Sequence, residues 1–143
     1  MTLAAAQVID AVAARLAPLA ATAGRVYTSR AWPLDEASLP AWRVEAADES
    51  VEPASLDGVN LHRLDIEASA YALTRADLDD TLHALASGGL ALIFAAPVSW
   101  ALQLTGIARQ ITTEGEASVG QITLRLAATY FVAPAQPDNI LSN

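Results

Sequence analysis

The residues that could perform acid–base or nucleophilic chemistry are few and scattered along this chain. It has two histidines, His62 and His83, and no Gly-x-Ser-x-Gly turn of the kind that presents a serine to a histidine base. His62 begins a strand-like segment, and His83 falls on the polar side of an expected helix. Both histidines are therefore predicted to face solvent, and no catalytic residue is expected.

Carboxylates and glycines are not spaced as metal or phosphate sites require. Asp77, Asp79 and Asp80 lie at the expected start of a helix, where the helix dipole already favours acids. The acids between residues 48 and 57 lack the alternating spacing and the glycine of a calcium loop. Gly88-Gly89 lacks the other residues of a phosphate-binding or dinucleotide-binding loop. No metal site and no cofactor site is predicted.

The composition fits one folded domain with apolar surface to spare. The chain has 143 residues and a mass of 14.9 kDa, close to the usual domain size of about 100–150 residues. Hydrophobic residues make up 53% of it, and many are alanines, which bury little area each. The sequence therefore predicts an ordered core together with exposed apolar surface available to partners.

Charge and cysteine content exclude further classes of function. With 16 acidic and 8 basic residues, the chain has a formal charge of −8, which repels a nucleic-acid backbone. Direct DNA binding is not expected unless arginines converge after assembly. The absence of cysteine excludes disulfides, thiolate nucleophiles and the common cysteine-containing zinc sites.

No targeting or membrane segment is expected. The longest apolar run, residues 90–97, is far shorter than the roughly 18–20 residues of a membrane helix. Asp10 and Arg15 interrupt the first segment, and no basic cluster precedes it, so a secretory signal is not supported. The protein is predicted to be made and kept in the cytoplasm.

The first half of the chain reads as one helix followed by strands. Thr2 to Ala17 has apolar residues at helical spacing, with Thr2 as the expected N-cap. Arg25 to Ser29 and Ala41 to Ala46 are predicted strands, the second with Trp42 and Val44 on one face. Asp48 to Asn60 is predicted to be a connecting loop, because it is acidic and lacks periodicity.

The second half is predicted to contain a strand, a helix and a long hairpin. The strand Arg63 to Tyr71 alternates clearly, and a capping box at Thr74 begins a helix that Gly88-Gly89 breaks or kinks. Residues 90–96 fit a resumed helix or a buried strand, and helix is favoured. Strands from Leu102 to Glu114, with a bulge at Gly106, and from Gln121 to Val132 then form the hairpin.

These elements predict a single α+β domain over residues 1–133. Its sheet is mainly antiparallel or mixed, two principal helices pack on one face, and the long C-terminal hairpin closes the chain. Residues 134–143 contain two prolines and are predicted to be a flexible arm that orders only against a neighbour. No internal repeat is present.

Two segments carry features suited to contacts. The proline-bounded loop from Arg30 to Pro40 displays Trp32 and Leu34, and large side chains on loops are typical interface anchors. The alternative is that these two side chains fold back to cover one end of the sheet. The hairpin after Thr105 is longer than a small core requires.

The arrangement resembles a known family. The similarity lies in an Ala-rich first helix, Gly24-Arg25-Val26-Tyr27, Pro33-Leu34-Asp35-Glu36-Ala37-Ser38-Leu39-Pro40-Ala41 before a strand, the strand Arg63 to Tyr71 leading into Asp77-Leu78-Asp79 and a helix, and the closing hairpin. On these patterns of size and polarity, nearly the whole chain resembles the tail-terminator proteins of long-tailed bacteriophages, the minor tail protein U-like family, and their counterparts in gene transfer agents. The apolar segment Leu90 to Phe94 departs from the family pattern.

The resemblance implies a structural protein of the virion or phage-like particle rather than an enzyme. Such a protein forms a homo-oligomeric, hexameric ring at the head-proximal end of the tail tube. There it stops polymerisation of the tail tube protein, offers a surface to the head-tail connector or stopper protein, and lets DNA pass as cargo. Assembly takes place in the host cytoplasm, without a membrane partner.

Specific residues are assigned to these contacts as hypotheses. The ring or stacking contacts are expected at Trp32, Leu34, Glu114, Glu116 and Phe131. The acids expected to face the channel or the head are Asp48, Glu49 and Glu52. Replacing Trp32 with Ala should weaken assembly and leave a folded monomer, and unchanged ring formation would refute its role.

Two alternatives remain open. The first, from the same setting, is a head-completion or neck connector protein, which binds the portal side instead of tube ends. The second is a small α+β enzyme or ligand-binding domain. A deep pocket that holds His62 or His83 beside a carboxylate would favour the second alternative.

Overall fold

A computed structural model describes residues 3–28, 39–73, 78–95, 100–114 and 117–141, with side chains except at 112–118. The elements in chain order are α1 (Ala4–Leu16), a 3-10 turn (Ala20–Thr22), β1 (Val26–Tyr27), β2 (Ala41–Pro53), β3 (Asn60–Leu73), α2 (Leu78–Ile93), β4 (Ala101–Glu114), β5 (Ala117–Val132) and β6 (Ile140–Leu141). The predicted α+β class is confirmed. Thr2 and Thr74, the two predicted capping residues, lie outside the described residues.

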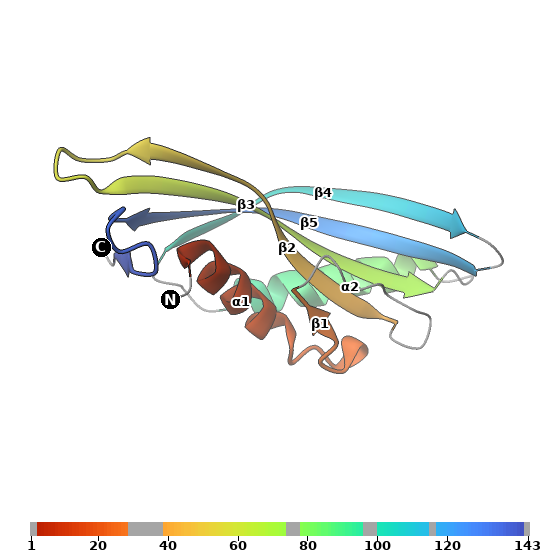
Figure 1. The fold of residues 1–143 in the computed structure, drawn as a ribbon. Coiled ribbons are helices and arrows are strands. Elements are labelled where there is room, and N and C mark those ends of the chain that lie inside the picture. The colour runs from red at the N-terminus through yellow and green to blue at the C-terminus, as the bar shows by residue number, and fades with distance from the viewer. Residues whose placement is uncertain (1–2, 29–38, 74–77, 96–99, 115–116, 142–143) are drawn as a thin grey trace.

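The strands form one twisted sheet in the order β1-β2-β3-β5-β4. The pairs β2–β3, β3–β5 and β4–β5 are antiparallel, whereas the short β1 pairs with β2 in parallel. β6 pairs with Phe131 and Val132 of β5, just beyond the point where β4 begins opposite Thr129. Figure 1 shows that the long strands run nearly the full length of the molecule.

Both helices lie on the same side of the sheet (Figure 1). α1 packs against β2 and β1, α2 packs against β3 and β5, and the two helices contact each other. The helix-facing positions of the strands and the inward positions of the helices form one core, whose largest fully buried side chains are Trp42, Tyr130, Leu16, Leu64, Ile66, Ile93, Ile122, Leu124, Leu126, Val8, Val12 and Val44. The period-2 alternation of the strands explains why one face alone is apolar.

Helix α2 continues through its two glycines. The sequence predicted a break or a kink at Gly88-Gly89; a break is wrong, since the helix is uninterrupted from Leu78 to Ile93, and helix is correct for residues 90–93. A Cβ at Gly89 would lie 2.7 Å from Cζ2 of Trp42, so only glycine lets the helix backbone approach the indole this closely. Packing on Trp42 therefore offsets the roughly 1 kcal/mol that a glycine costs inside a helix.

The acidic segment predicted to be a loop is mostly strand. β2 extends through Pro53 and β3 begins at Asn60, with pairs such as Glu49↔Leu64 and Val51↔His62 between them. The loop prediction was wrong because backbone pairing with β3 satisfies these residues even though their side chains are acidic and exposed. The remaining turn is short, and Gly58 within it has φ +84. The resulting hairpin extends beyond the helices (Figure 1).

The C-terminal segment folds back onto the same chain. β6 pairs with the end of β5, the Ala4 amide donates to the carbonyl of Pro137 at 3.0 Å, and the Gln7 side chain donates to the carbonyl of Asp138. This placement differs from the free arm that the sequence predicted. The segment folds back because the first turn of α1 has backbone amides without helical partners. The C-terminal segment supplies a carbonyl acceptor to one of them.

Neither helix in the described part of the chain has both the length and the apolarity that spanning a membrane demands.

Candidate functional site

The outer edge of β4 is left open. Among the described residues, β4 pairs with β5 and with no strand on its other side. Three helix-facing side chains of β4 remain exposed, with Leu104 at 42%, Ile107 at 40% and Ile111 at 58%. They are uncovered because α2 packs over β3 and β5, one and two strands further in. We name Leu104, Ile107 and Ile111 the β4 edge patch.

A bulge aligns the three aliphatic side chains of this patch. The register of β4 against β5 shifts between Leu104 and Gly106, as the sequence predicted for Gly106. The extra residue keeps Leu104 and Ile107 on the same face although they are three positions apart. Opposite Gly106, the side chain of Arg125 passes within 3.8 Å of where a Cβ would stand. Arg125 therefore lies across the other face of this edge.

A hollow of about 290 Å³ separates the β4 edge patch from the start of α2. Its lining includes Leu82, His83, Arg109 and Ile111. Nε of Arg109 donates a hydrogen bond to Nε2 of His83 at 3.2 Å. His83 is exposed, as predicted. Its acceptor nitrogen is engaged by a permanent cation, which does not favour a role as a base.

A second polar cluster lies at the other end of the sheet, on the helix-bearing face. Oε1 of Glu49 accepts a hydrogen bond from Nδ1 of His62 at 2.8 Å and another from the Tyr130 hydroxyl at 2.7 Å. The rings of His62 and Tyr130 stack with centroids 5.3 Å apart. Burial, reinforced by the bond to Glu49, raises the pKa of Tyr130 far above its usual range.

This cluster corrects the expectation for His62, whose side chain is 19% exposed and not fully solvent-facing. The reason is the strand extension of β2, which carries Glu49 to the position beside it. The sequence contained both residues, but placing Glu49 in a loop hid their cross-strand relation. A hollow of about 280 Å³ adjoins the cluster and is lined by Leu3, Ala4, Ala5, Glu49, Val51, Asn60, His62, Val132, Pro134 and Pro137.

The cluster can orient an imidazole and bind a small polar group. A carboxylate that accepts from Nδ1–H leaves Nε2 as the acceptor nitrogen, the arrangement of a histidine general base. The described lining of the hollow offers no serine, threonine or lysine to act as a nucleophile. The same contacts also serve folding, since the buried hydroxyl of Tyr130 needs an acceptor.

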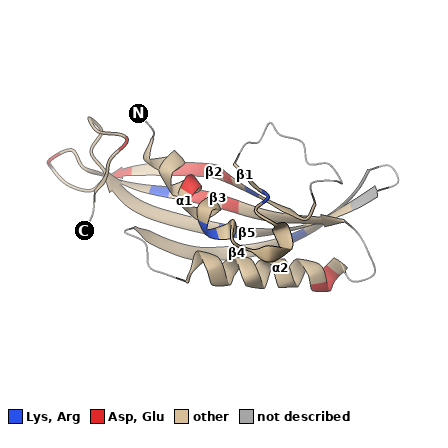
Figure 2. Cartoon of the chain, turned by 90° about the horizontal axis from the view of Figure 1, so that it is seen from below, with Lys and Arg blue, Asp and Glu red and all other residues tan. Residues whose placement is uncertain are grey.

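The predicted acids lie on β2 and split between the faces of the sheet. Their register against β3 places Asp48 and Glu52 on the face away from the helices and Glu49 on the helix-bearing face. Figure 2 shows acidic segments along β2 and at the start of α2. Asp48 and Glu52 are exposed, whereas Glu49 is held by His62 and Tyr130.

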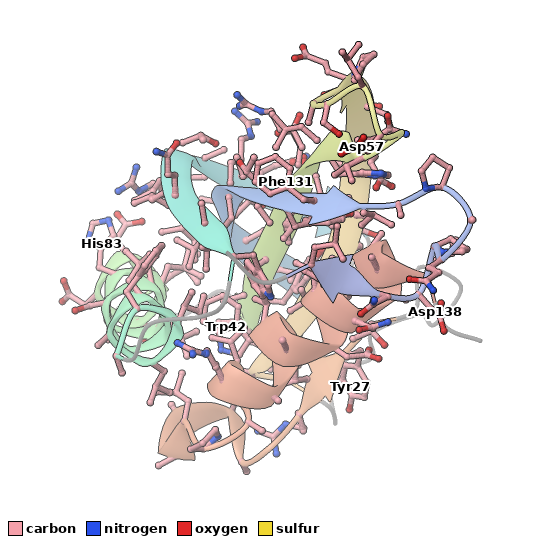
Figure 3. The ribbon with its side chains drawn as sticks, turned by 90° about the vertical axis from the view of Figure 1, so that its left-hand side faces the viewer. Tyr27, Trp42, Asp57, His83, Phe131 and Asp138 are labelled. Carbon is pink, nitrogen blue, oxygen red and sulfur yellow. The ribbon has the colours of Figure 1, made fainter. Side chains whose placement is uncertain are left out.

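The structure describes only some of the five residues predicted to form contacts. Phe131 is half-buried, pairs with Leu61 and Leu141, and points away from the helices (Figure 3). Glu114 ends β4, and its side chain is outside the described set. Trp32, Leu34 and Glu116 lie outside the described residues altogether. Of these five residues, only Phe131 has a described side chain. The β4 edge patch is a candidate contact surface that the sequence analysis did not identify.

The acids of α2 do not form a metal site in the part that is described. Asp79 and Asp80 lie exposed in the first turn, and Asp77 is outside the described residues. Within that part of the chain, no group of three or more histidine, aspartate or glutamate side chains converges as metal ligands would.

Comparison with known proteins adds no assignment, since no protein-family model matches the chain and no curated protein matches its sequence.

Proposed function

We propose that this chain is a structural protein that assembles into a ring at the head-proximal end of a phage-like tail tube. In that position it ends tube polymerisation and presents a surface to the head-tail connector. The observation that carries the proposal is the β4 edge, where an unpaired strand displays three exposed aliphatic side chains. An open, partly apolar edge strand is a template for pairing with another chain.

The shape of the sheet also supports assembly. β4 and β5 form a long hairpin, and β2 and β3 extend beyond the helices at the opposite end. Strands of 13 to 16 residues are more than twice the usual length of about 5–6 residues in globular domains. The two helices pack on β1, β2, β3 and β5. Within the described part of the chain, the outer edge of β4 and the extended end of the β2–β3 hairpin therefore lie beyond the helices.

The charge of the chain fits a ring through which DNA passes. The face of the sheet away from the helices carries Asp48, Glu52 and Glu67, with Arg63 and Arg125 among them. A net charge of −8 disfavours adhesion of a phosphate backbone to the assembled subunits. Such a surface suits DNA as cargo, not as a bound partner.

The direct test combines the chain with a purified phage tail tube protein. Purified tube protein is polymerised with and without the chain, and tubes are imaged by negative-stain electron microscopy. We expect a ring at one end of each tube and shorter tubes as the chain is added in larger amounts. Unchanged tube lengths and bare tube ends at saturating chain would reject the proposal.

The neck-connector alternative is decided by the same preparation. A neck protein binds the portal side of the head and leaves tube ends bare. Sedimentation of the chain with purified tubes, and separately with tailless heads, therefore separates the two roles. Binding to tubes supports a terminator, and binding to heads alone supports a neck connector.

A second candidate function rests on the hollow beside His62 and Glu49. Its polar groups suit a general base or a small-ligand site, because Glu49 orients the imidazole. Hydrolysis of p-nitrophenyl acetate is a simple probe of an activated imidazole. A rate above that of free imidazole that is lost in His62→Gln, and retained in His83→Gln, would favour this candidate over a purely structural role.

A further inference from the structure

We propose that the partner covering the β4 edge is the β2 edge of a second copy of this chain, joined head to tail. The inference rests on the proposed ring-forming function and specifies which surfaces meet. The β2 edge is defined as Asp48–Pro53 together with Leu3, which lies next to it on the helix-bearing face. The β4 edge patch of one copy packs against this surface of the next.

The β2 edge is open in the same sense as the β4 edge. Among the described residues, positions 48–53 pair with β3 and with no strand on the other side. Val51 is 51% exposed and faces the helix side, and Leu3 is 62% exposed. Leu3 and Ala5 border two neighbouring hollows of about 280 and 470 Å³. The surface can therefore receive aliphatic side chains.

Exposed apolar side chains are concentrated at these two edges. The exposed large hydrophobic residues of the described chain are Leu3, Val51, Leu56, Phe94, Leu104, Ile107 and Ile111. Three of these seven belong to the β4 edge patch and two to the β2 edge, all on the helix-bearing face of one sheet. Edge-to-edge pairing would bring the two groups together on that face and remove both from water.

Strand directions permit this contact in a ring. β2, β3, β5 and β4 are each antiparallel to the next, so β2 and β4 run in opposite directions. The two surfaces are offset along the strands, since Ile107 is level with Val44 through Leu124 and Ala68, whereas the β2 edge begins at Asp48. A ring axis inclined to the strands, as in a β-barrel, supplies this offset and keeps the neighbouring edge strands antiparallel. β4 of one copy then meets β2 of the next in antiparallel orientation. A contact between two different surfaces also continues from copy to copy until the ring closes.

The β4 edge and the β2 edge carry different charged side chains. Arg109 lies beside the β4 edge patch, and Arg125 crosses the other face of that edge. The β2 edge carries Asp48 and Glu52 on its outer face, and Asp10 lines the larger hollow on its helix side. On the outer face, Asp48 and Glu52 of the β2 edge therefore meet Arg125 of the β4 edge, which favours this pairing. On the helix-bearing face, Asp79 lines the same hollow as Arg109 and balances its charge within one copy.

The symmetric alternative pairs β4 with β4 of a second copy. It would place Arg125 of one copy near Arg125 of the other, which costs energy through like-charge repulsion. It would also close after two copies and leave the β2 edges uncovered. The head-to-tail contact avoids both problems.

Engineered cysteines test the contact, and no native thiol can form a competing disulfide because the chain has no cysteine. Leu104→Cys, Ile107→Cys and Ile111→Cys sample the register of the β4 edge, and each is mixed with Val51→Cys under mild oxidation. We expect disulfide dimers in at least one mixture and none from a single variant alone. Gln103→Cys, on the opposite face of β4, is the matched control and should not crosslink to Val51→Cys.

The outcomes separate the contact from the proposed function. Ring formation, measured by native mass spectrometry, together with a crosslink to Val51→Cys supports the inference. Rings without any such crosslink, or dimers formed by one β4 variant alone, overturn the inference and leave the ring-forming function standing. Persistent monomers both alone and with tail tubes overturn the proposed function itself.

Discussion

The middle of the helix-bearing face and the β4 edge of the same face share an alternating pattern of apolar residues. They differ in whether the helices bury those residues. In the middle, Trp42 and Leu124 are fully buried beneath the helices, whereas Ile107 and Ile111 at the edge are 40% and 58% exposed. Both regions alternate apolar and polar residues, so the sequence pattern identifies the face and not what covers it. In the proposed assembly, the middle of this face provides stability and the β4 edge provides contacts with neighbours.

The largest loss of stability is expected from Trp42→Ala. The indole is fully buried beneath α1 and α2, so its removal leaves a cavity and should lower the free energy of unfolding by about 3–5 kcal/mol. Urea denaturation measures this loss. Trp42→Phe is the control: it keeps most of the ring, and Nε1 of Trp42 has no hydrogen-bond partner among the described residues. Equal losses in the two variants would contradict the cavity explanation.

Gly89→Ala tests the close contact between α2 and the sheet. Its Cβ would meet the Trp42 ring at 2.7 Å, so overpacking should cost about 1–3 kcal/mol. Gly88→Ala is the matched control, since its Cβ would meet the end of the flexible Leu19 side chain, and alanine also favours the helix. Thermal unfolding of both variants should rank Gly89→Ala as the less stable. The reverse ranking would rule out Trp42 as the reason for Gly89.

Tyr130→Phe should have a smaller and pH-dependent effect. It removes the hydrogen bond to Glu49 and should lower the free energy of unfolding by about 1 kcal/mol at neutral pH. Because folding raises the pKa of Tyr130 above its ordinary value of 10.0, the unfolded state loses this proton first as the pH rises. Wild-type stability should therefore fall above about pH 10.

The Tyr130→Phe variant lacks this titration, so its deficit relative to wild type should shrink above that pH. Urea unfolding of both proteins between neutral pH and pH 11 measures the difference. A deficit that stays constant over this interval would show that Tyr130 does not couple stability to pH.

Ile107→Ser should have the smallest effect on folding and a large effect on assembly. The side chain is 40% exposed in the single chain, so the free energy of unfolding should change by at most about 1 kcal/mol. Ring formation should be lost, because a polar group replaces an aliphatic contact. Leu56→Ser, at the exposed hairpin turn, should keep the ring. Loss of assembly in both variants, or in neither, would remove the distinction between edge and middle.

The elements with strong periodicity were predictable from the sequence. The α1 and β3 segments, the inward face of Trp42 and Val44, and the bulge at Gly106 follow from local spacing and are observed. The strand character of residues 48–53 was not predictable in this way, because it comes from pairing with β3 rather than from local preference. The Glu49–His62 contact was hidden for the same reason.

The candidate site was less predictable than the fold. Alternation places Leu104, Ile107 and Ile111 on the apolar face, but their exposure depends on where α2 lies. Nothing local to β4 contains this information. The contact residues expected from loops and turns fall largely outside the described chain, so Trp32→Ala keeps its value as an independent test of assembly.

The hydrogen bond between the C-terminal segment and the first turn of α1 has a practical consequence for purifying the protein. Because the amide of Ala4 binds the carbonyl of Pro137, the first and last described residues lie at the same end of the molecule (Figure 1), and Leu3 and Pro134 line the same hollow. A purification tag at either terminus therefore begins next to the β2 edge and obstructs the neighbour expected there. Joining the termini with a short linker and reopening the chain at the β2–β3 turn would give a circular permutant that removes this obstruction.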